Sequence, residues 1–321
     1  MKRTLPLLLV GLWVGSACAQ ADYPTRPVRV VAPFPPGQGT ELIARAVSAQ
    51  LSAQMGQNFF VENRPGAAGI IGTEAVKNAA PDGYTLLVAG SGPFAINMAM
   101  YSKLPYDTLR DFQPIGMIAA VPNVLVVSND FPAANVKELI AYAVKQGEKL
   151  NYASSGVGVP NHLIMEMLKS AAGLKTTHVP YKGATASIAA LISGEIGLMF
   201  ETPGAIVPHI RSGRVRALAV SSAQRSVALP DLPTVAEAGG LKGFGAQGWS
   251  ALAAPAATPP AIIQRLHAEL RTALARPDMK KRLLDLGVDP LDFTFEQTGA
   301  YFRSEVENWA KAVKSAGIKP E

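Results

Sequence analysis

VRVVAPFPPGQGTELIARAVSAQLSAQM, residues Val28 to Met55, is the stretch that decides the fold. It opens with an apolar run to Ala32, which predicts a strand buried in a parallel sheet. The run breaks on prolines and glycines between residues 35 and 39, which predicts a turn. A helical period follows, with apolar residues at spacings of three and four along one face. That face carries Leu42, Ile43, Ala46, Val47, Leu51 and Met55.

The turn places the start of a helix at the carboxyl edge of the strand. Thr40 stands where an N-cap residue is expected, and Glu41 falls in the first helical turn. We call such a turn, which joins the carboxyl end of a strand to the start of a helix, a mouth. The backbone N–H groups of a mouth point outward without partners, and this attracts anions. An ordinary strand-to-helix connection has the same pattern and stays open as the alternative. No phosphate motif is present, since the G-x-G-x-x-G pattern fails at Leu42 and no Gly-Lys pair occurs.

The N-terminus predicts a secretory signal peptide over residues 1–19. Two basic residues precede an apolar run, Leu5–Val14, and a small-residue A-x-A site ends at Ala19. The run is too short for a membrane-spanning helix, which needs about 20 residues. Cleavage is expected after Ala19, with Ala21 as the second choice. A lipid anchor at Cys18 is an alternative that the flanking residues favour less.

Composition narrows the class of protein. Cys18 is the only cysteine, so the chain after cleavage can hold no disulfide, thiolate nucleophile or cysteine metal site. About 300 residues can bury a large core and suggest two lobes. The net charge of +6 comes from scattered basic residues without aromatic interleaving, which argues against nucleic acid as a partner. A mildly positive field suits an anionic small ligand, and a solvated surface explains it equally well.

Strands and helices alternate along the chain, which predicts an α/β protein with two doubly wound lobes around a cleft. The first lobe is expected over 20–121 together with 245–321, and the second over 122–244. The long apolar run Ile115–Ser128 is expected to cross from the first lobe to the second. The last predicted helix, Phe295–Ala316, carries an apolar stripe that indicates packed core.

Small, glycine-bearing turns follow five of the predicted strands. They lie at residues 36–41, 90–93, 154–160, 181–184 and 201–204. The second leads into a short helix at Ala95, and Pro160 stands at the first helical position after the third. Ligands bind beyond the carboxyl ends of strands in open α/β sheets, so the two lobes are expected to face each other across a ligand cleft. Backbone N–H groups and hydroxyls can hold a carboxylate there without a charged partner.

The chemistry-bearing residues match no catalytic or metal motif. None of the four histidines stands at a metal-binding spacing from another. They are His162, His178, His209 and His267. Ser154 or Ser155 with His162 is the nearest approach to a catalytic set, but the G-x-S-x-G pattern of a nucleophile elbow is absent. Glu41 and Glu201 each stand at a mouth, where they could together bind a cation or an ammonium group, or could cap helices.

Several segments together resemble one known family. They are Tyr23–Pro24, Val28–Pro36, Val61–Ala67, Pro81–Thr85, Ser155–Gly158 and Val179–Gly183. In this order, over essentially the whole chain after the signal, they resemble the Bug-type receptors, the extracytoplasmic solute-binding proteins of tripartite tricarboxylate transporters. The resemblance implies a type II periplasmic-binding-protein fold, capture of one small solute between hinged lobes, and delivery to an inner-membrane permease. Family ligands are mostly carboxylates, among them citrate, acidic amino acids and aromatic acids.

The resemblance also implies which loops bind the ligand. They are Pro36–Glu41, Ser154–His162 and Tyr181–Gly183 in this chain. The usual family pattern G-G-G-T-D reads Gly37-Gln38-Gly39-Thr40-Glu41 here, and Val159 replaces a common serine or threonine. Because Val159 removes a hydroxyl, the site is expected to be less polar. A monocarboxylate, or a ligand with an apolar part, is therefore favoured over citrate.

The residues expected to bind the ligand come from the mouths of both lobes. They are Phe34, Gly37, Gln38, Gly39, Thr40, Glu41, Ser91, Ser154, Ser155, Gly158, Val159, His162, Tyr181, Gly183 and Glu201. The chain is thus predicted to be a monomeric periplasmic receptor for a small organic carboxylate, with permease subunits as partners and neither a cofactor nor a catalytic activity. A sensor for a signalling system, a binding protein without a transporter, and a secreted serine hydrolase are the alternatives.

Overall fold

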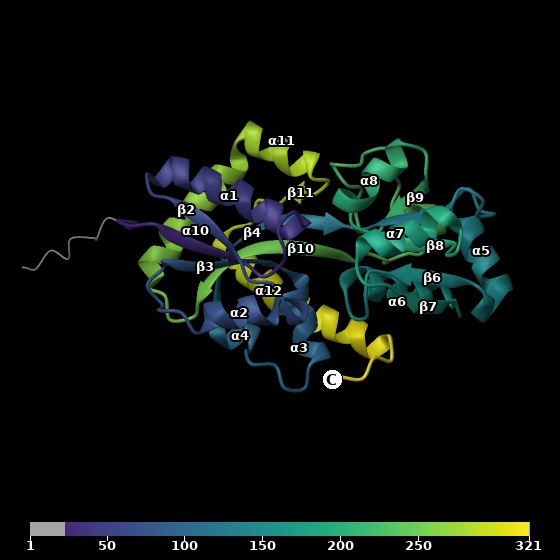
Figure 1. The fold of residues 1–321 in the computed structure, drawn as a ribbon, viewed down its shortest axis with the longest axis horizontal. Helices are drawn as coiled ribbons and strands as arrows, with labels where there is room; N and C mark the ends of the chain where they lie inside the picture. The colour runs from purple at the N-terminus through teal and green to yellow at the C-terminus, as the bar shows by residue number, and fades with distance from the viewer. Residues whose placement is uncertain (1–22, 321) are drawn as a thin grey trace, which may run out of the picture.

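The computed structural model describes residues 23–320. The predicted signal peptide, its cleavage sites and Cys18 lie outside the described residues. Two sheets, each covered by helices, form two lobes side by side, and the chain ends near the border between them (Figure 1). Across residues 23–320, no helix combines the length and the apolar character that crossing a membrane requires.

Six strands form the sheet of the first lobe. They are β1 (Val28–Ala32), β2 (Phe59–Asn63), β3 (Thr85–Gly90), β4 (Phe112–Pro122), β10 (Gln247–Pro255) and β11 (Asp289–Pro290). Their order across the sheet is β11-β4-β10-β3-β1-β2. The predicted buried strand β1 pairs in parallel with β2 and β3. Strand β10, which comes much later in the chain, inserts antiparallel between β3 and β4 and joins the two parts of the sheet.

Helices cover both faces of this sheet. They are α1 (Gly39–Met55), η1 (Ala67–Gly69), α2 (Ile70–Lys77), η2 (Gly92–Ile96), α3 (Asn97–Met100), α4 (Thr108–Asp111), α10 (Pro260–Ala275), α11 (Pro277–Asp285) and α12 (Phe295–Ser315). Val30 of β1 faces a core built with α1, α10 and α11. Its neighbour Val31 faces the opposite core, to which α2, η2 and α12 contribute. Successive strand residues therefore serve two separate cores, as the continuous apolar run requires.

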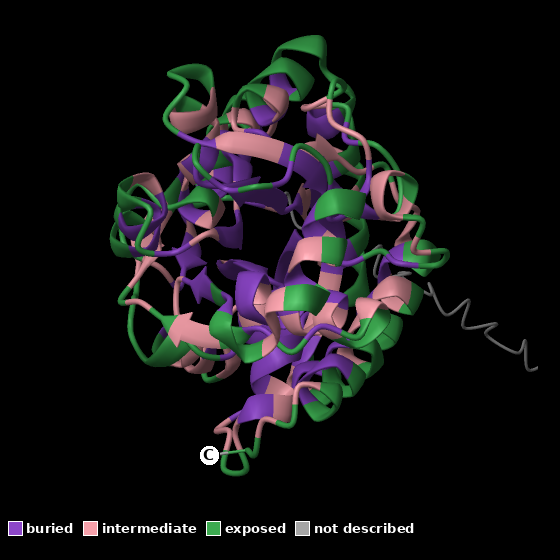
Figure 2. Cartoon of the chain, turned by 90° about the vertical axis from the view of Figure 1, so that its right-hand side faces the viewer, coloured by how far each residue is buried: buried purple, intermediate pink, exposed green. Residues whose placement is uncertain are grey.

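Five strands form the sheet of the second lobe. They are β5 (Val124–Val127), β6 (Asn151–Ser154), β7 (Thr177–Pro180), β8 (Leu198–Glu201) and β9 (Arg216–Val220), in the order β7-β6-β8-β5-β9. The helices of this lobe are α5 (Val136–Gln146), η3 (Gly147–Lys149), α6 (Pro160–Ala172), α7 (Ala184–Ser193), α8 (Pro203–Arg211) and α9 (Val235–Gly239). Pro160 is the first residue of α6, as predicted. The buried residues gather in the sheets and on the inner sides of the helices (Figure 2).

The chain passes between the lobes at two places that are hydrogen-bonded to each other. The predicted run Ile115–Ser128 does cross, but as the two strands β4 and β5, which belong to different sheets and are separated by Asn123. Asn123 N donates to Ser221 Oγ at 2.9 Å, and Ser221 N donates to the Asn123 carbonyl at 2.8 Å. On the return, Ala246 N donates to the Ser221 carbonyl at 2.9 Å. These bonds form the hinge, and they support the predicted division into lobes, which stays a proposal.

One hydrophobic cluster spans both lobes. The Trp249 ring of β10 stacks on Phe94 with centroids 6.0 Å apart and packs against Phe302 of α12 at 5.0 Å. Trp309, two turns further along α12, shares this cluster with Leu163 of α6 in the second lobe. The apolar stripe of the last helix is therefore packed core, as predicted, and it joins the first lobe to the second.

One local prediction is wrong. Helix α1 begins at Gly39, with Gln38 rather than Thr40 as its N-cap and without a side-chain cap. The predicted short helix at Ala95 is present as the π-helical turn η2, closed by a bond from Asn97 N to the Gly92 carbonyl. The Pro93 carbonyl in this turn accepts the Tyr106 hydroxyl at 2.7 Å, a contact between segments that the local sequence does not reveal.

Gly72→Ala should destabilise the first lobe. A Cβ at Gly72 would lie 2.7 Å from the Arg64 carbonyl oxygen and 2.9 Å from Pro33 Cα, and both are backbone atoms. Overpacking of this kind costs about 1–3 kcal/mol of unfolding free energy. Denaturant unfolding of the variant measures the loss. Gly92→Ala is the control, because no heavy atom lies within 4 Å of its added Cβ, and equal stability of the two variants would contradict the prediction.

Candidate functional site

The first-lobe mouth is organised by a buried glutamate. The side chain of Glu41 is 1% exposed, and its Oε2 accepts the N–H of Gly37 at 3.0 Å. Its Oε1 forms an ion pair with Arg45, one helical turn later. Gly37 has a φ of +84°, a conformation that glycine adopts without strain. Glu41 thus closes the turn that Thr40 was expected to cap. The N–H of Gly37, one of the groups predicted to be free, is already hydrogen-bonded to it.

The other predicted residues of this mouth lie around the turn. Phe34 is half-buried, and Asn63 of β2 holds its carbonyl with a 2.9 Å bond from Nδ2. Gln38 and Gly39 are exposed at the start of α1. A Cβ on Gly90, at the end of β3, would lie 3.8 Å from Thr40 Oγ1. The mouths after β1 and β3 therefore adjoin.

Ser91 lies at the end of β3, beside the hinge. It is buried, and a Cβ on Gly248 of β10 would lie 3.5 Å from its Oγ. This predicted site residue therefore sits close to the strand that returns from the second lobe.

A second buried glutamate ties together two mouths of the second lobe. Glu201, 2% exposed, accepts Ser155 Oγ at 2.7 Å, Thr202 N at 2.7 Å and Asn161 Nδ2 at 3.1 Å. Burial raises the pKa of Glu201, and these donors oppose that rise. Asn161 also bonds Ser155 Oγ at 2.9 Å, and sequence reasoning missed this residue. Glu41 and Glu201 are thus each bound within their own lobe and do not act as the predicted pair across a cleft.

Two stacked imidazoles lie beneath the loop that follows β6. His162 and His178 stack with centroids 3.9 Å apart, and Tyr152 stacks on His178 at 4.9 Å. His162 Nδ1 accepts the N–H of Gly158 at 3.0 Å, so it must be unprotonated. Burial lowers the pKa of both rings, that of His178 to about 4. Sequence reasoning placed His178 in a strand but did not select it for the site.

The geometry does not assemble the serine hydrolase alternative. Ser154, not exposed at all, contacts His178 Nε2 at 2.6 Å rather than His162. Its hydroxyl also donates to the Gly156 carbonyl at 2.7 Å. Because the hydroxyl proton of Ser154 is used in that bond, His178 must donate its Nε2–H to Ser154 Oγ. The imidazole therefore cannot accept the proton of the hydroxyl. Ser155 bonds Glu201, so neither serine has the predicted partner.

The loop after β7 pairs with the loop after β6. Tyr181 N donates to the Ser154 carbonyl at 3.0 Å, and Gly183 N donates to the Ser155 carbonyl at 3.1 Å. The Tyr181 hydroxyl donates to Glu195 Oε1 at 2.7 Å and is thereby held away from these loops. Three mouths of the second lobe are therefore joined by hydrogen bonds into one surface.

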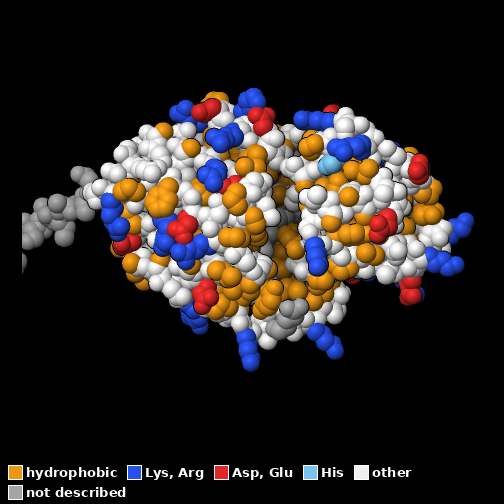
Figure 3. All heavy atoms as spheres, viewed as in Figure 1, with side chains coloured by type: hydrophobic (Ala, Val, Ile, Leu, Met, Phe, Trp, Pro, Cys, Tyr) orange, Lys and Arg blue, Asp and Glu red, His pale blue; other side chains and the backbone are white. Residues whose placement is uncertain are grey.

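The two lobes meet at the rim of this surface. A Cβ on Gly158, which has a φ of +73°, would lie 2.5 Å from Met100 Cε of the first lobe. Val159, the N-cap residue of α6, is half-buried next to it. A groove separates the lobes on the face where α1 and α7 lie, and hydrophobic side chains line part of it (Figure 3). Gly158, in the second-lobe mouth after β6, therefore approaches Met100 of the first lobe in this interlobe region.

The stability of the protein should depend on pH through His178. Its folded-state pKa of about 4 lies below the ordinary value of 6.5, so between these pH values only the unfolded chain takes up the proton. The unfolding free energy should therefore fall as the pH decreases from 6.5 toward 4, while Glu201, with its raised pKa, opposes the fall. Urea unfolding of wild type and His178→Gln checks this. The variant should show the flatter dependence, and parallel curves would contradict the assignment.

The comparisons with known proteins agree with this architecture. The family described as tripartite tricarboxylate transporter family receptor matches residues 43–318. BugT of Bordetella pertussis is 34% identical over 325 residues, covering 99% of this chain and 99% of BugT. A protein from the tcbD-tcbE intergenic region of Pseudomonas sp. strain P51 is 36% identical, covering 97% of this chain and 93% of its own.

Solved structures agree as well. R. palustris Rpa4515 with adipate superposes with a TM-score of 0.84 at 35% identity, covering 94% of this chain and 100% of its own. BugD, a periplasmic binding protein, gives 0.79 at 36%, covering 93% and 100%. MatC from Rhodopseudomonas palustris with bound malate gives 0.77 at 32%, covering 91% and 100%. The chain therefore belongs to the tripartite tricarboxylate transporter family receptors and is a Bug-type solute-binding protein.

Proposed function

We propose that this receptor closes its lobes over a small organic carboxylate in the periplasm and presents it to the permease of a tripartite transporter. The observation that carries the proposal is the approach of a second-lobe mouth, at Gly158, to Met100 across the border between the lobes. The relatives solved with adipate and with bound malate support a carboxylate as the ligand.

The donors in this cleft are neutral. None of the proposed site residues is a lysine or an arginine. Helices α1, α6 and α7 each begin at one of the mouths, and the N–H groups of a first helical turn have no acceptor within the helix. Together with the helix dipoles, these N–H groups favour an anion. A carboxylate bound between lobes would use donors from both and so favour the closed arrangement.

The cleft also has apolar walls, which favours a ligand with an apolar segment. Val157 is 55% exposed at the tip of the second-lobe loop, next to Val159. Phe34 on the first lobe is half-buried, and Met100 touches the same second-lobe loop at Gly158. Citrate carries polar groups along its whole length, whereas adipate has a four-methylene chain between its carboxylates. Adipate and comparable acids are therefore the first candidates.

Asn123 adds a polar group at the base of the cleft. The strand register places it opposite Thr202, in the turn after Glu201. Its side chain is 1% exposed, and neither Oδ1 nor Nδ2 has a partner among the described residues. An unpaired buried amide is costly and calls for an explanation. Binding of a ligand carboxylate or its bridging water by Nδ2 supplies one.

A panel of carboxylates should contain a stabilising ligand. A ligand that binds only the folded state adds about 2.7 kcal/mol at a hundredfold excess over its Kd. We expect adipate or another acid with an apolar segment to raise the Tm of the mature protein, and citrate to bind more weakly. Thermal shift followed by calorimetry measures both.

The protein for this panel is first unfolded and refolded, which removes any ligand carried through purification. A panel without a single shift would contradict the receptor proposal. Submicromolar binding of citrate would contradict the preference for an apolar segment while leaving the receptor proposal intact.

Asn123→Ala should weaken binding of the best ligand without destabilising the fold. A hydrogen bond to a charged group contributes about 1.5–3 kcal/mol, so Kd should rise roughly 10- to 100-fold. The Tm without ligand should not fall, since the side chain has no partner to lose. Asn151→Ala, at an exposed residue of β6, is the matched control. Equal Kd values for the two variants would remove Asn123 from the site.

A further inference from the structure

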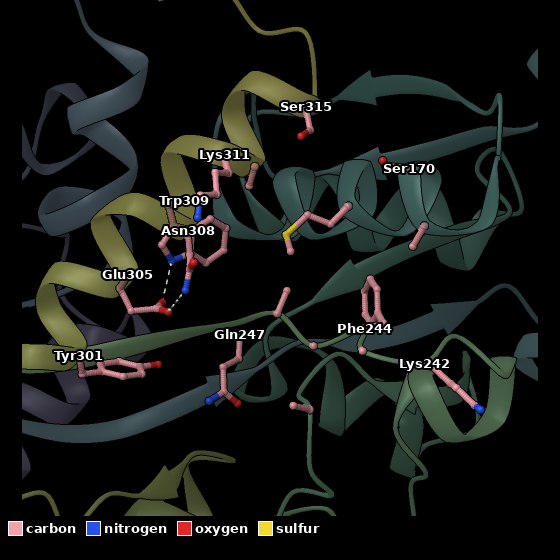
Figure 4. A pocket seen from close by; sticks show the side chains of 17 residues that line it. Ser170, Lys242, Phe244, Gln247, Tyr301, Glu305, Asn308, Trp309, Lys311 and Ser315 are labelled. Carbon is pink, nitrogen blue, oxygen red and sulfur yellow. Dashed lines mark hydrogen bonds between the residues drawn. The ribbon is translucent and has the colours of Figure 1, made fainter. Parts of the chain in front are cut away.

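A second cavity lies between the lobes, away from the strand mouths. Its volume is about 590 Å³, within the range of small-molecule sites. One wall is α12 of the first lobe, and the other consists of α6 and residues 242–244 of the second lobe, with residues 245–247 of the returning chain beside them (Figure 4). None of the residues proposed for the carboxylate site lines it. The cavity is thus a separate interlobe space.

The floor of this cavity is apolar and partly aromatic. Phe244 and Trp309 lie on opposite walls (Figure 4), and Met167 of α6 also lines the cavity. Phe244 is 7% exposed and Trp309 3%, so both rings are fixed by packing. Such walls suit a flat or aliphatic body of modest size.

The single carboxylate of the lining is already bound. Glu305 Oε2 accepts the indole N–H of Trp249 at 2.7 Å. It also accepts the indole N–H of Trp309 at 3.1 Å, and Glu305 Oε1 accepts Asn308 Nδ2 at 3.3 Å (Figure 4). Burial raises the pKa of Glu305, and the hydrogen bonds from Asn308, Trp249 and Trp309 oppose that rise. Glu305 therefore fixes the Trp249 and Trp309 rings in place and offers little attraction to a cation.

The remaining charges of the lining are two lysines, one from each lobe. Lys242 precedes Phe244 in the second lobe, and Lys311 follows Trp309 on α12 (Figure 4). Both are exposed, and neither forms an ion pair with a carboxylate within residues 23–320. The lining thus combines apolar side chains with one lysine from each lobe, and this composition is complementary to an amphiphilic anion.

We propose that this cavity is a second binding site, which takes a small amphiphilic anion with its apolar body on Phe244, Trp309 and Met167 and its charged group near Lys242 and Lys311. Because its walls belong to different lobes, an occupant contacts both and responds to the angle between them. Trp249, bonded to Glu305, lies on the hinge-side strand β10. Helix α6 runs from the mouth residue Asn161 to Ser170 in the cavity wall, about 14 Å along its axis.

The test uses 8-anilinonaphthalene-1-sulfonate, an amphiphilic anion whose fluorescence rises in apolar sites, with the mature protein in the absence of any carboxylate. We expect saturable binding of one molecule per chain. Ala171→Phe fills the cavity from an exposed residue of α6 and should abolish this binding. The double variant Lys242→Gln/Lys311→Gln should weaken it about fivefold, as the loss of two exposed ion pairs predicts.

Matched controls come from α5, which does not line the cavity. Ala141→Phe adds the same ring at an exposed position, and Lys137→Gln/Lys145→Gln removes the same net charge. Both controls should bind like the wild type, and circular dichroism verifies that every variant is folded. Absence of saturable binding to wild type, or equal binding by cavity and control variants, would overturn the proposal. Because no carboxylate is present, the result does not depend on the proposed function of the cleft.

Discussion

The hydrogen bonds between the two crossing segments are the constraint on which the rest of the molecule depends. Asn123 and Ser221 each donate to the other, and Ala246 extends the pairing to the returning chain. The segments that connect the lobes are thus kept adjacent in any arrangement of the lobes that preserves these bonds. Relative motion is then restricted to changes of backbone dihedrals within a few residues, which is the usual character of a hinge.

The mouths on either side of the hinge depend on two buried acids. It is unexpected that the proposed site for anions contains Glu41 and Glu201, since a carboxylate facing the ligand would repel it. In both cases the carboxylate points into its own loop and accepts hydrogen bonds from that loop. The acids therefore prearrange the loops. Preorganisation of this kind reduces the ordering cost of binding.

Much of the architecture could be predicted from the sequence, because the signals that define it are local. The apolar run at Val28, the glycine-bearing turns and the proline at the start of α6 each act within a few residues, and the structure confirms the elements that they predict. Thr40 was misjudged because Glu41, an equally local residue, provides the bond to Gly37 instead. The pattern of polar and apolar residues is the same whether Thr40 or Glu41 holds the turn, so it could not show which residue does.

The contacts of the site were less accessible, because they depend on strand register. His178 reaches Ser154 only because β6 and β7 pair in parallel with Tyr152 opposite His178. Asn161 reaches Glu201 across 40 residues of sequence, compared with 24 between Ser154 and His178. Neither of these two contacts can be predicted when the segments of the sequence are considered one at a time.

The late position of β10 in the chain has a consequence for the order of folding. The second lobe is continuous between its first and last strands, Val124 to Val220, so all of its sheet is available once that segment has emerged. The first sheet still lacks its central strand β10 at that stage, and α12 follows only after a further helical segment. Chains emerge from the N-terminus, and domains fold as units. The inserted lobe can therefore complete its sheet before the lobe that encloses it, and the last helix to appear is the one that packs the two together.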